Sequence, residues 1–141
     1  MINIPGLAER VGAVEDYFRV DAELPAPDRE IVILATARHA GARYAWARHE
    51  ARGKTAGTRP EVIEALRSQG PLDGLTERER LLIEMVRELR NTASLSDATF
   101  KRAIDLLGQR QLIEVVVLSG HYGIVGSVIN AFGVGEASPT F

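Results

Sequence analysis

Hydrophobic positions separated by steps of three and four residues predict amphipathic helices along much of this chain. The clearest helix follows residues 76–79, where Thr-Glu-Arg-Glu has the form of a capping box, in which both side chains satisfy backbone N–H groups at a helix start. A similar helix is predicted to begin at the cap Ser96 and to stop at Gly108. The apolar stripes are Leu82, Met85, Val86 and Leu89 in the first helix, and Phe100, Ala103, Ile104 and Leu107 in the second.

Two weaker patterns predict shorter helices. Residues 58–61, Thr-Arg-Pro-Glu, form another candidate capping box, from which we expect a helix to about Ser68. Apolar residues also recur at helical spacing in residues 11–18. We therefore treat residues 1–27 as an N-terminal segment that contains one short helix, and we expect Asp28 to cap the helix that follows it.

The two most apolar segments are similar to each other. In residues 28–41, the positions from Ile31 to Leu34 are apolar or β-branched on every side, a composition that fits a buried strand as well as a helix. In residues 111–132, Glu114-Val-Val-Val-Leu118 parallels Glu30-Ile-Val-Ile-Leu34, which suggests a weak internal repeat of a two-helix unit. The later segment is apolar on more than one face, so we expect a homo-oligomer whose contacts use it. Glycines that would permit close backbone approach there are Gly120, Gly123 and Gly126.

Composition indicates one soluble domain and excludes several classes of protein. The chain has 141 residues, of which 45% are hydrophobic and 26% are charged, enough for a single core. A net charge of −2 and a pI near 5.9 give no basic surface, so we expect neither nucleic acid nor a membrane as a partner. The absence of cysteine excludes disulfides, thiolate metal sites and cysteine-based redox chemistry. The N-terminus lacks the pattern of a signal peptide, so a cytoplasmic protein is expected.

Residues 28–57 contain the strongest candidate for chemistry, His49. In a helix, Ala42, Ala45 and His49 would lie on or near one face. An imidazole between a carboxylate and an apolar helix face can act as an acid or a base near pH 7. A structural alternative stays open, because a lone helical histidine is commonly a packing residue, and Glu30 would also suit the start of a helix through the helix dipole.

This segment resembles the signature of the carboxymuconolactone decarboxylase family, which includes the alkylhydroperoxidase D-like proteins. The shared pattern is a glutamate, an apolar run, Gly-Ala-x-Tyr-x-Trp-x-x-His at residues 41–49, and a following Ala-x-Gly. Redox members of the family have Cys-x-x-Cys-x-x-x-His and a preceding glutamate that relays protons. In this chain the histidine corresponds to His49 and the glutamate to Glu30. The two cysteines correspond to Ala42 and Ala45, so both thiols are missing.

The resemblance extends over about residues 24–135 and is closest to the branch of the family without these cysteines. It implies an all-α, alkylhydroperoxidase D-like helical bundle in a single domain, residues 28–135, followed by a tail at 136–141. It also implies a homo-oligomer that binds a small molecule and requires no cofactor. The site residues that it implies are His49 and Glu30 for catalysis, and Tyr44, Trp46 and Tyr122 for substrate binding.

No metal site is predicted from the histidines. His39, His49 and His121 lack the i, i+4 spacing of common metal sites and have no carboxylates clustered around them in sequence. A series of arginines is predicted to lie mostly on a solvated face, from which one guanidinium could bind a substrate carboxylate. These are Arg38, Arg43, Arg48 and Arg52.

Three functions are compatible with these observations. The first is lyase-type acid/base chemistry on a small carboxylated lactone or keto acid, with His49 as proton carrier and Glu30 as its partner. Decarboxylation needs stabilisation of a developing enolate more than a nucleophile, so the missing cysteines do not forbid it. The second is a non-enzymatic small-molecule-binding or structural oligomer of the same fold. The third, an alkylhydroperoxidase or peroxiredoxin-like activity, is disfavoured by Ala42 and Ala45.

One geometric observation separates the first two functions. A hydrogen bond between Glu30 and His49 beside a water-accessible pocket would favour an enzyme. Dry packing of His49 without a partner would favour a structural role.

Overall fold

The computed structural model describes residues 3–135 and 141. These residues form six α-helices and no strand, which confirms the all-α fold class. Apart from Phe141, the predicted tail at 136–141 lies outside the described residues. The helices are α1 (Pro5–Val20), α2 (Ala26–His39), α3 (Arg43–Ala56), α4 (Pro60–Ser68), α5 (Glu77–Thr92) and α6 (Asp97–Ala131).

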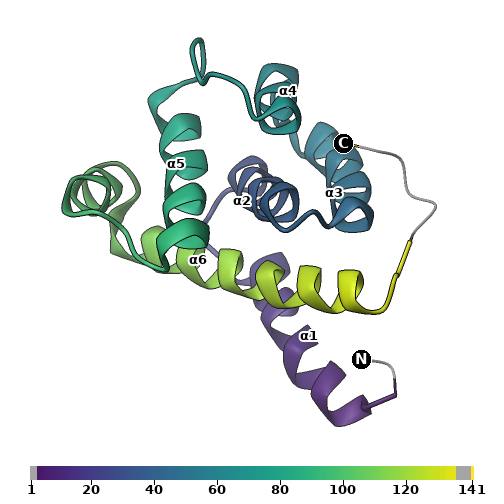
Figure 1. The fold of residues 1–141 in the computed structure, drawn as a ribbon. Helices are drawn as coiled ribbons and strands as arrows, with labels where there is room; N and C mark the ends of the chain where they lie inside the picture. Colours follow the sequence, from purple (N-terminus) through teal and green to yellow (C-terminus); the bar gives the residue numbers. More distant parts are fainter. Residues whose placement is uncertain (1–2, 136–140) are drawn as a thin grey trace.

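Helix α2 lies at the centre of the bundle (Figure 1). It contacts α3, α4, α5 and α6, and its side chains are buried at consecutive positions from Ile31 to Ala37. Burial on all sides explains why this segment has no polar face and why its composition fits a buried strand equally well. Helix α1 contacts α6 and extends beyond the rest of the bundle (Figure 1).

The two predicted capping boxes have different outcomes. Thr76 forms the predicted capping box, because its hydroxyl accepts the N–H of Glu79 and its own N–H donates to the Glu79 carboxylate at 2.8 Å. Thr58 does not cap α4. The N-cap of that helix is Arg59, which makes no side-chain capping bond, and the Thr58 hydroxyl instead donates to the carbonyl of Pro27 at 3.3 Å.

Asp28 also differs from its prediction as a helix cap. Helix α2 begins two residues earlier, at Ala26, without a side-chain cap. The Asp28 carboxylate is buried, and its Oδ2 accepts a hydrogen bond from Nε of Arg78 on α5 at 2.6 Å. A buried carboxylate needs a hydrogen-bond partner. Asp28 therefore links the first turn of α2 to α5 and does not cap the N-terminus of α2.

Gly108 interrupts α6, as the sequence predicts. Its φ of 75° and ψ of 167° lie outside the helical region, while the chain is helical on both sides of it. Glycine adopts this conformation readily because it has no Cβ. The first half of α6 begins at Ser96, whose hydroxyl accepts the N–H of Thr99 at 3.3 Å, again as predicted.

The apolar stripe predicted for this first half is only partly buried. Ala103 and Leu107 lie in the core, but Phe100 is 51% exposed and Ile104 is 36% exposed. Two of the four stripe residues are therefore buried and two are exposed. Helical spacing identifies which residues share a face, but it does not determine whether the chain supplies an element to cover that face.

The glycines of α6 are used mainly inside the chain. A Cβ added at Gly126 would lie 3.3 Å from that of Ala40 and 3.4 Å from that of Ala42, so α6 closely approaches the connection between α2 and α3. A Cβ at Gly123 would clash with an arginine side chain of α5, whereas a Cβ at Gly120 would meet open space. At Gly126, the close approach is therefore between segments of the same chain.

Helix α6 nevertheless leaves apolar surface uncovered. By length and composition it could cross a membrane, a test that core helices of soluble proteins also pass, and 44% of its most apolar 18-residue window is buried. The expected cytoplasmic location therefore stays a prediction.

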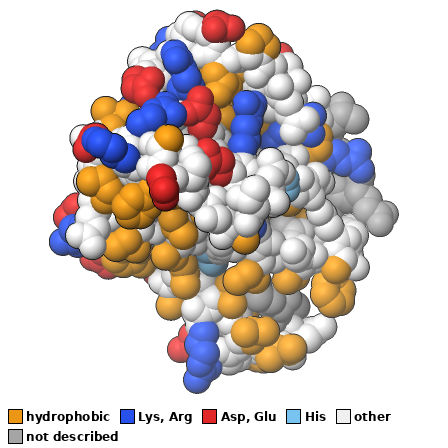
Figure 2. All heavy atoms as spheres, turned by 60° about the vertical axis from the view of Figure 1, so that its left-hand side comes forward, with side chains coloured by type: hydrophobic (Ala, Val, Ile, Leu, Met, Phe, Trp, Pro, Cys, Tyr) orange, Lys and Arg blue, Asp and Glu red, His pale blue; other side chains and the backbone are white. Residues whose placement is uncertain are grey.

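Figure 2 shows hydrophobic side chains gathered on the lower left of the visible face, with charged side chains concentrated above them. The exposed large apolar residues of α6 are Phe100, Ile104, Leu106, Ile113, Val116, Val117 and Ile124.

Candidate functional site

The hairpin of α2 and α3 brings Glu30 and His49 together. Gly41, with a φ of 66°, lies in the turn between the two helices, and α3 packs against α2. The Nδ1 atom of His49 lies 2.8 Å from Oε2 of Glu30, and the two side chains are only 7% and 14% exposed. An ionised carboxylate can only accept a hydrogen bond, so Nδ1 carries the proton and Nε2 of the neutral imidazole is left as an acceptor.

Tyr122 of α6 contacts the second nitrogen of His49. Its hydroxyl oxygen lies 3.0 Å from Nε2, and the two rings meet edge to face with centroids 5.0 Å apart. Tyr122 is buried, and this burial, with the nearby charge of Glu15, raises the pKa of its hydroxyl above the usual value. The sequence predicts Tyr122 as a substrate-binding residue, and the structure places its hydroxyl directly on the imidazole.

Glu15 of α1 belongs to the same cluster, and the sequence analysis missed it. Both of its carboxylate oxygens lie 3.0 Å from the Tyr122 hydroxyl. Nε2 of His121 lies 3.4 Å from this carboxylate and Nη1 of Arg52 lies 3.9 Å from it. The interaction with His121 is the main cause that holds the pKa of Glu15 below its usual value. The available signal was a charged residue inside the apolar stripe of residues 11–18.

A pocket of about 610 Å³ opens beside these residues. Its volume suits a small molecule, and it combines apolar walls with a few convergent polar groups, as ligand pockets commonly do. Three arginines in its lining offer positive charge to an anionic ligand. Besides the arginines Arg19, Arg29 and Arg52, the polar lining residues are Glu15, Glu30, His49, Thr55 and Tyr122, and the apolar walls include Phe18, Ile33 and Leu118.

The structure does not bring Tyr44 and Trp46 to this pocket. Trp46 is 1% exposed, and its Nε1 donates to Oε2 of Glu50 at 3.1 Å. The Tyr44 hydroxyl accepts a hydrogen bond from Arg48 at 3.3 Å, on another part of the surface. Neither ring lines the pocket, whose α3 residues besides His49 are Ala51, Arg52, Thr55 and Ala56.

The alanines at the family's cysteine positions are also buried. Ala42 is 0% exposed and Ala45 is 5% exposed, and neither lines the pocket. Together with His49 they form the buried face of α3 that their spacing predicts. These alanines therefore contribute no reactive group to the pocket.

The other histidines and arginines separate into pocket and non-pocket residues. His39 is exposed at the end of α2, whereas His121 reaches Glu15 at the pocket. Among the described residues, no three His, Asp or Glu side chains are arranged to hold a metal ion. Of the four arginines predicted as a solvated series, Arg52 lines the pocket, while Arg38 donates to a backbone carbonyl of α4.

The sequence comparison identifies the family. The model of the carboxymuconolactone decarboxylase family matches residues 5–88, more than half of the chain, and the protein belongs to this family. The match includes Glu15, Glu30 and His49 but ends before Tyr122, and it begins earlier than the resemblance noted from residue 24. A comparison with curated proteins found no match.

Proposed function

We propose that this chain is a lyase that uses acid/base chemistry on a small carboxylated lactone or keto acid. The observation that supports this most directly is the 2.8 Å contact between Glu30 and His49 beside a pocket of about 610 Å³. A carboxylate bonded to Nδ1 fixes the tautomer of the imidazole and stabilises its protonated form. The pair therefore has the arrangement needed to hold and release one proton.

In the proposed reaction the bond between the substrate carboxylate and its neighbouring carbon breaks, and carbon dioxide leaves. The electron pair of that bond enters the adjacent carbonyl system as an enolate. Protonated His49 supplies the proton that converts the enolate into product, and the Tyr122 hydroxyl, 3.0 Å from Nε2, belongs to a residue that lines the same pocket. Glu30 keeps its hydrogen bond to Nδ1 throughout and balances the charge of the imidazolium.

Substrate binding is assigned to residues other than those implied by the family resemblance. The arginines Arg19, Arg29 and Arg52 lie in the pocket lining, where a guanidinium can bind a carboxylate through two hydrogen bonds. Phe18 and Leu118 supply apolar walls. In this proposal Arg52, which is next to Glu15, anchors the substrate carboxylate, and Tyr44 and Trp46 support the helix that carries His49.

The test is release of carbon dioxide from a panel of carboxylated lactones and keto acids incubated with the purified protein. We expect at least one compound to react, and His49→Ala to abolish the reaction. His39→Ala is the matched control, because His39 is exposed and lies away from the pocket. Full activity in His49→Ala, or equal loss in both variants, would contradict the proposal.

The alternative is a non-enzymatic small-molecule-binding oligomer. The buried alanines at positions 42 and 45 favour it over a hydroperoxidase, because no thiol is present to attack a peroxide. Binding of a panel compound in calorimetry without its conversion, in wild type and in His49→Ala alike, would support this alternative. Dithiol-dependent peroxide turnover by metal-free protein would instead support the disfavoured alkylhydroperoxidase activity.

We further propose that the chain forms a homo-oligomer through the exposed apolar face of α6. This face includes a shallow groove of about 270 Å³, none of whose lining residues is charged. An uncharged apolar surface can pack against a symmetry-related copy of itself without burying an unpaired charge. The lining residues are Leu95, Phe100, Ile104, Gln109, Leu112, Ile113, Val116 and Val117.

Light scattering tests this assembly directly. A stable interface of this apolar kind would bury about 2,000 Å² or more, so we expect an oligomer at micromolar concentration. Val117→Glu should yield monomers, because Val117 is 46% exposed and a buried glutamate would meet no partner. A wild-type mass near 15.4 kDa would contradict the proposal.

A further inference from the structure

The hydroxyl of Tyr122 lies within hydrogen-bond distance of more acceptors than it has protons. Its oxygen is 3.0 Å from Nε2 of His49 and 3.0 Å from each carboxylate oxygen of Glu15. A phenol donates one proton. While His49 is neutral, its Nε2 and the carboxylate compete for that proton. Once His49 is protonated, Nε2 becomes a donor and the hydroxyl must donate to Glu15.

We propose that Tyr122 and Glu15 form a proton path between His49 and solvent. In one transfer the Nε2–H bond of His49 breaks and its proton binds the Tyr122 oxygen, while the hydroxyl's own proton moves to Glu15. The products are a neutral imidazole, an unchanged tyrosine and a protonated Glu15, so atoms and charge balance without a co-reactant. The path deepens the proposed function, because it rests on His49 acting as an acid and a base.

The exposed fractions of the side chains indicate which end of the proton path contacts solvent. The side chain of His49 is 7% exposed, whereas that of Glu15 is 39% exposed. Proton exchange with bulk water is therefore easier at Glu15 than at the imidazole. Within residues 3–135 and 141, the Tyr122 hydroxyl bonds only these two groups, so Glu15 is the protein group that can take its proton onward from His49.

Charged and titratable groups from four helices face this cluster and tune it. Bonding to His121 lowers the pKa of Glu15, so the carboxylate gives its proton up to water readily after each transfer. Burial raises the pKa of Tyr122, so the phenol keeps a proton and relays it instead of ionising. The groups concerned are Glu15 and Arg19 of α1, Glu30 and Arg29 of α2, His49 and Arg52 of α3, and His121 and Tyr122 of α6.

The test is the rate at which the ring N–H protons of His49 exchange with water, measured by NMR on the full chain at a pH where the imidazole is protonated. We expect Tyr122→Phe and Glu15→Gln each to slow this exchange by about tenfold or more, because each removes one group of the relay. Glu9→Gln is the matched control. Glu9 is an exposed carboxylate on the same helix, so its replacement should leave the exchange rate unchanged.

The sign of the effect separates a relay from a structural role. If Tyr122 and Glu15 only pack the site, their replacement would loosen it and make the exchange faster. Unchanged or faster exchange in the folded variants would therefore overturn the proposal. Glu15→Gln carries the test if Tyr122→Phe does not fold, because the Glu15 side chain lies partly in solvent. The measurement needs no substrate, so absence of carbon dioxide release would count against the proposed function alone.

Discussion

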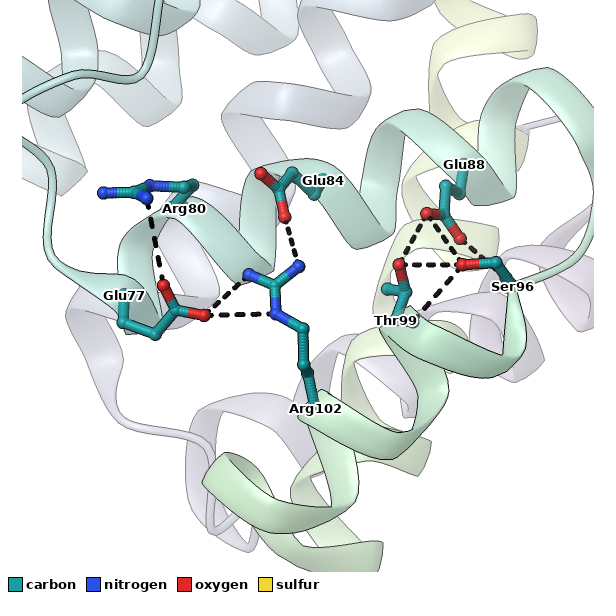
Figure 3. A network of polar contacts seen from close by, with 7 residues as sticks. All are labelled: Glu77, Arg80, Glu84, Glu88, Ser96, Thr99 and Arg102. Carbon is teal, nitrogen blue, oxygen red and sulfur yellow. Dashed lines mark hydrogen bonds and ion pairs between the residues drawn. The ribbon is translucent and has the colours of Figure 1, made fainter.

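Two polar networks in this protein have different compositions. The surface network joins α5 to the first half of α6 and is built around Arg102, which binds Glu77 at 2.7 Å and Glu84 at 2.8 Å (Figure 3). The buried network links Glu30, His49, Tyr122 and Glu15, and its nearest guanidinium is 3.9 Å from Glu15. The first contains a permanent cation, and the second contains groups whose protons can move.

The remaining part of the surface network fixes the start of α6. The carboxylate of Glu88 accepts the N–H of Ser96 at 2.8 Å and the hydroxyl of Thr99 at 2.6 Å (Figure 3). These bonds lower the pKa of Glu88, and the bond from Thr99 has the largest effect. The carboxylate therefore stays ionised and available as an acceptor. A network that must hold two helices in place thus uses groups that do not change charge near neutral pH.

This contrast indicates what each network is for. Permanent charges at an exposed helix contact give orientation and contribute little stability, because solvent screens them. A buried chain of carboxylate, imidazole and phenol costs more to assemble, since every member needs a partner away from water. The pocket lies at the buried network and not at the surface network, and the proposed function uses a mobile proton there.

The largest difference between the networks is expected in activity. His49→Ala should lower turnover of a responsive substrate by about a hundredfold or more, while Arg102→Ala should leave it unchanged. The loss of one or two hydrogen bonds should cost His49→Ala on the order of 1 to 2 kcal/mol of unfolding free energy, so the variant stays folded. Carbon dioxide release and circular dichroism test both points. An unfolded His49→Ala would instead mark His49 as a core residue.

The next difference is expected in stability. Glu30→Ala should reduce the unfolding free energy by about 1 to 3 kcal/mol, because it leaves the buried Nδ1–H of His49 without an acceptor. Glu77→Ala should cost less than Glu30→Ala, because its partner Arg102 remains hydrated. Urea unfolding of both variants measures the two values. Equal losses would show that burial does not distinguish the networks.

A smaller effect is expected from pH. The pKa of Glu15 is lowered in the folded chain, chiefly by His121, so ionised Glu15 stabilises the fold above its unfolded pKa, and this contribution is lost as pH falls through the folded pKa. Glu15→Gln should therefore be less stable than wild type at pH 7, by less than about 1 kcal/mol because the side chain is partly solvated. The difference should shrink as urea unfolding is repeated toward pH 3. A constant difference would contradict this linkage.

The smallest effect is expected for the surface network alone. Arg102→Ala should reduce the unfolding free energy by about 0.5 kcal/mol in low salt. The reduction should be smaller in 1 M salt, where charges more than about 3 Å apart are screened from each other. The NMR chemical shifts of the His49 ring should not change in this variant, because Arg102 lies outside the pocket. A change in those chemical shifts would show that the two networks are coupled.

The sequence alone determined most of the helices and part of the site. The stripe of α5 and its Thr76 capping box follow from local spacing and local side-chain chemistry, and both occur as predicted. The correspondence of Glu30 and His49 came from the family pattern, and the structure places them 2.8 Å apart. Such features depend on neighbours along the chain or on a motif that the chain retains.

Tertiary structure decided the rest. Glu15 lies 107 residues from Tyr122, and only the packing of α1 on α6 brings its carboxylate to the hydroxyl. Tertiary packing also keeps the buried Trp46 out of the pocket and leaves Phe100 exposed, neither of which follows from helical spacing. A helical period specifies which side chains share a face. Which face meets another helix, a pocket or water depends on contacts between segments far apart in sequence, and periodicity carries no information about them.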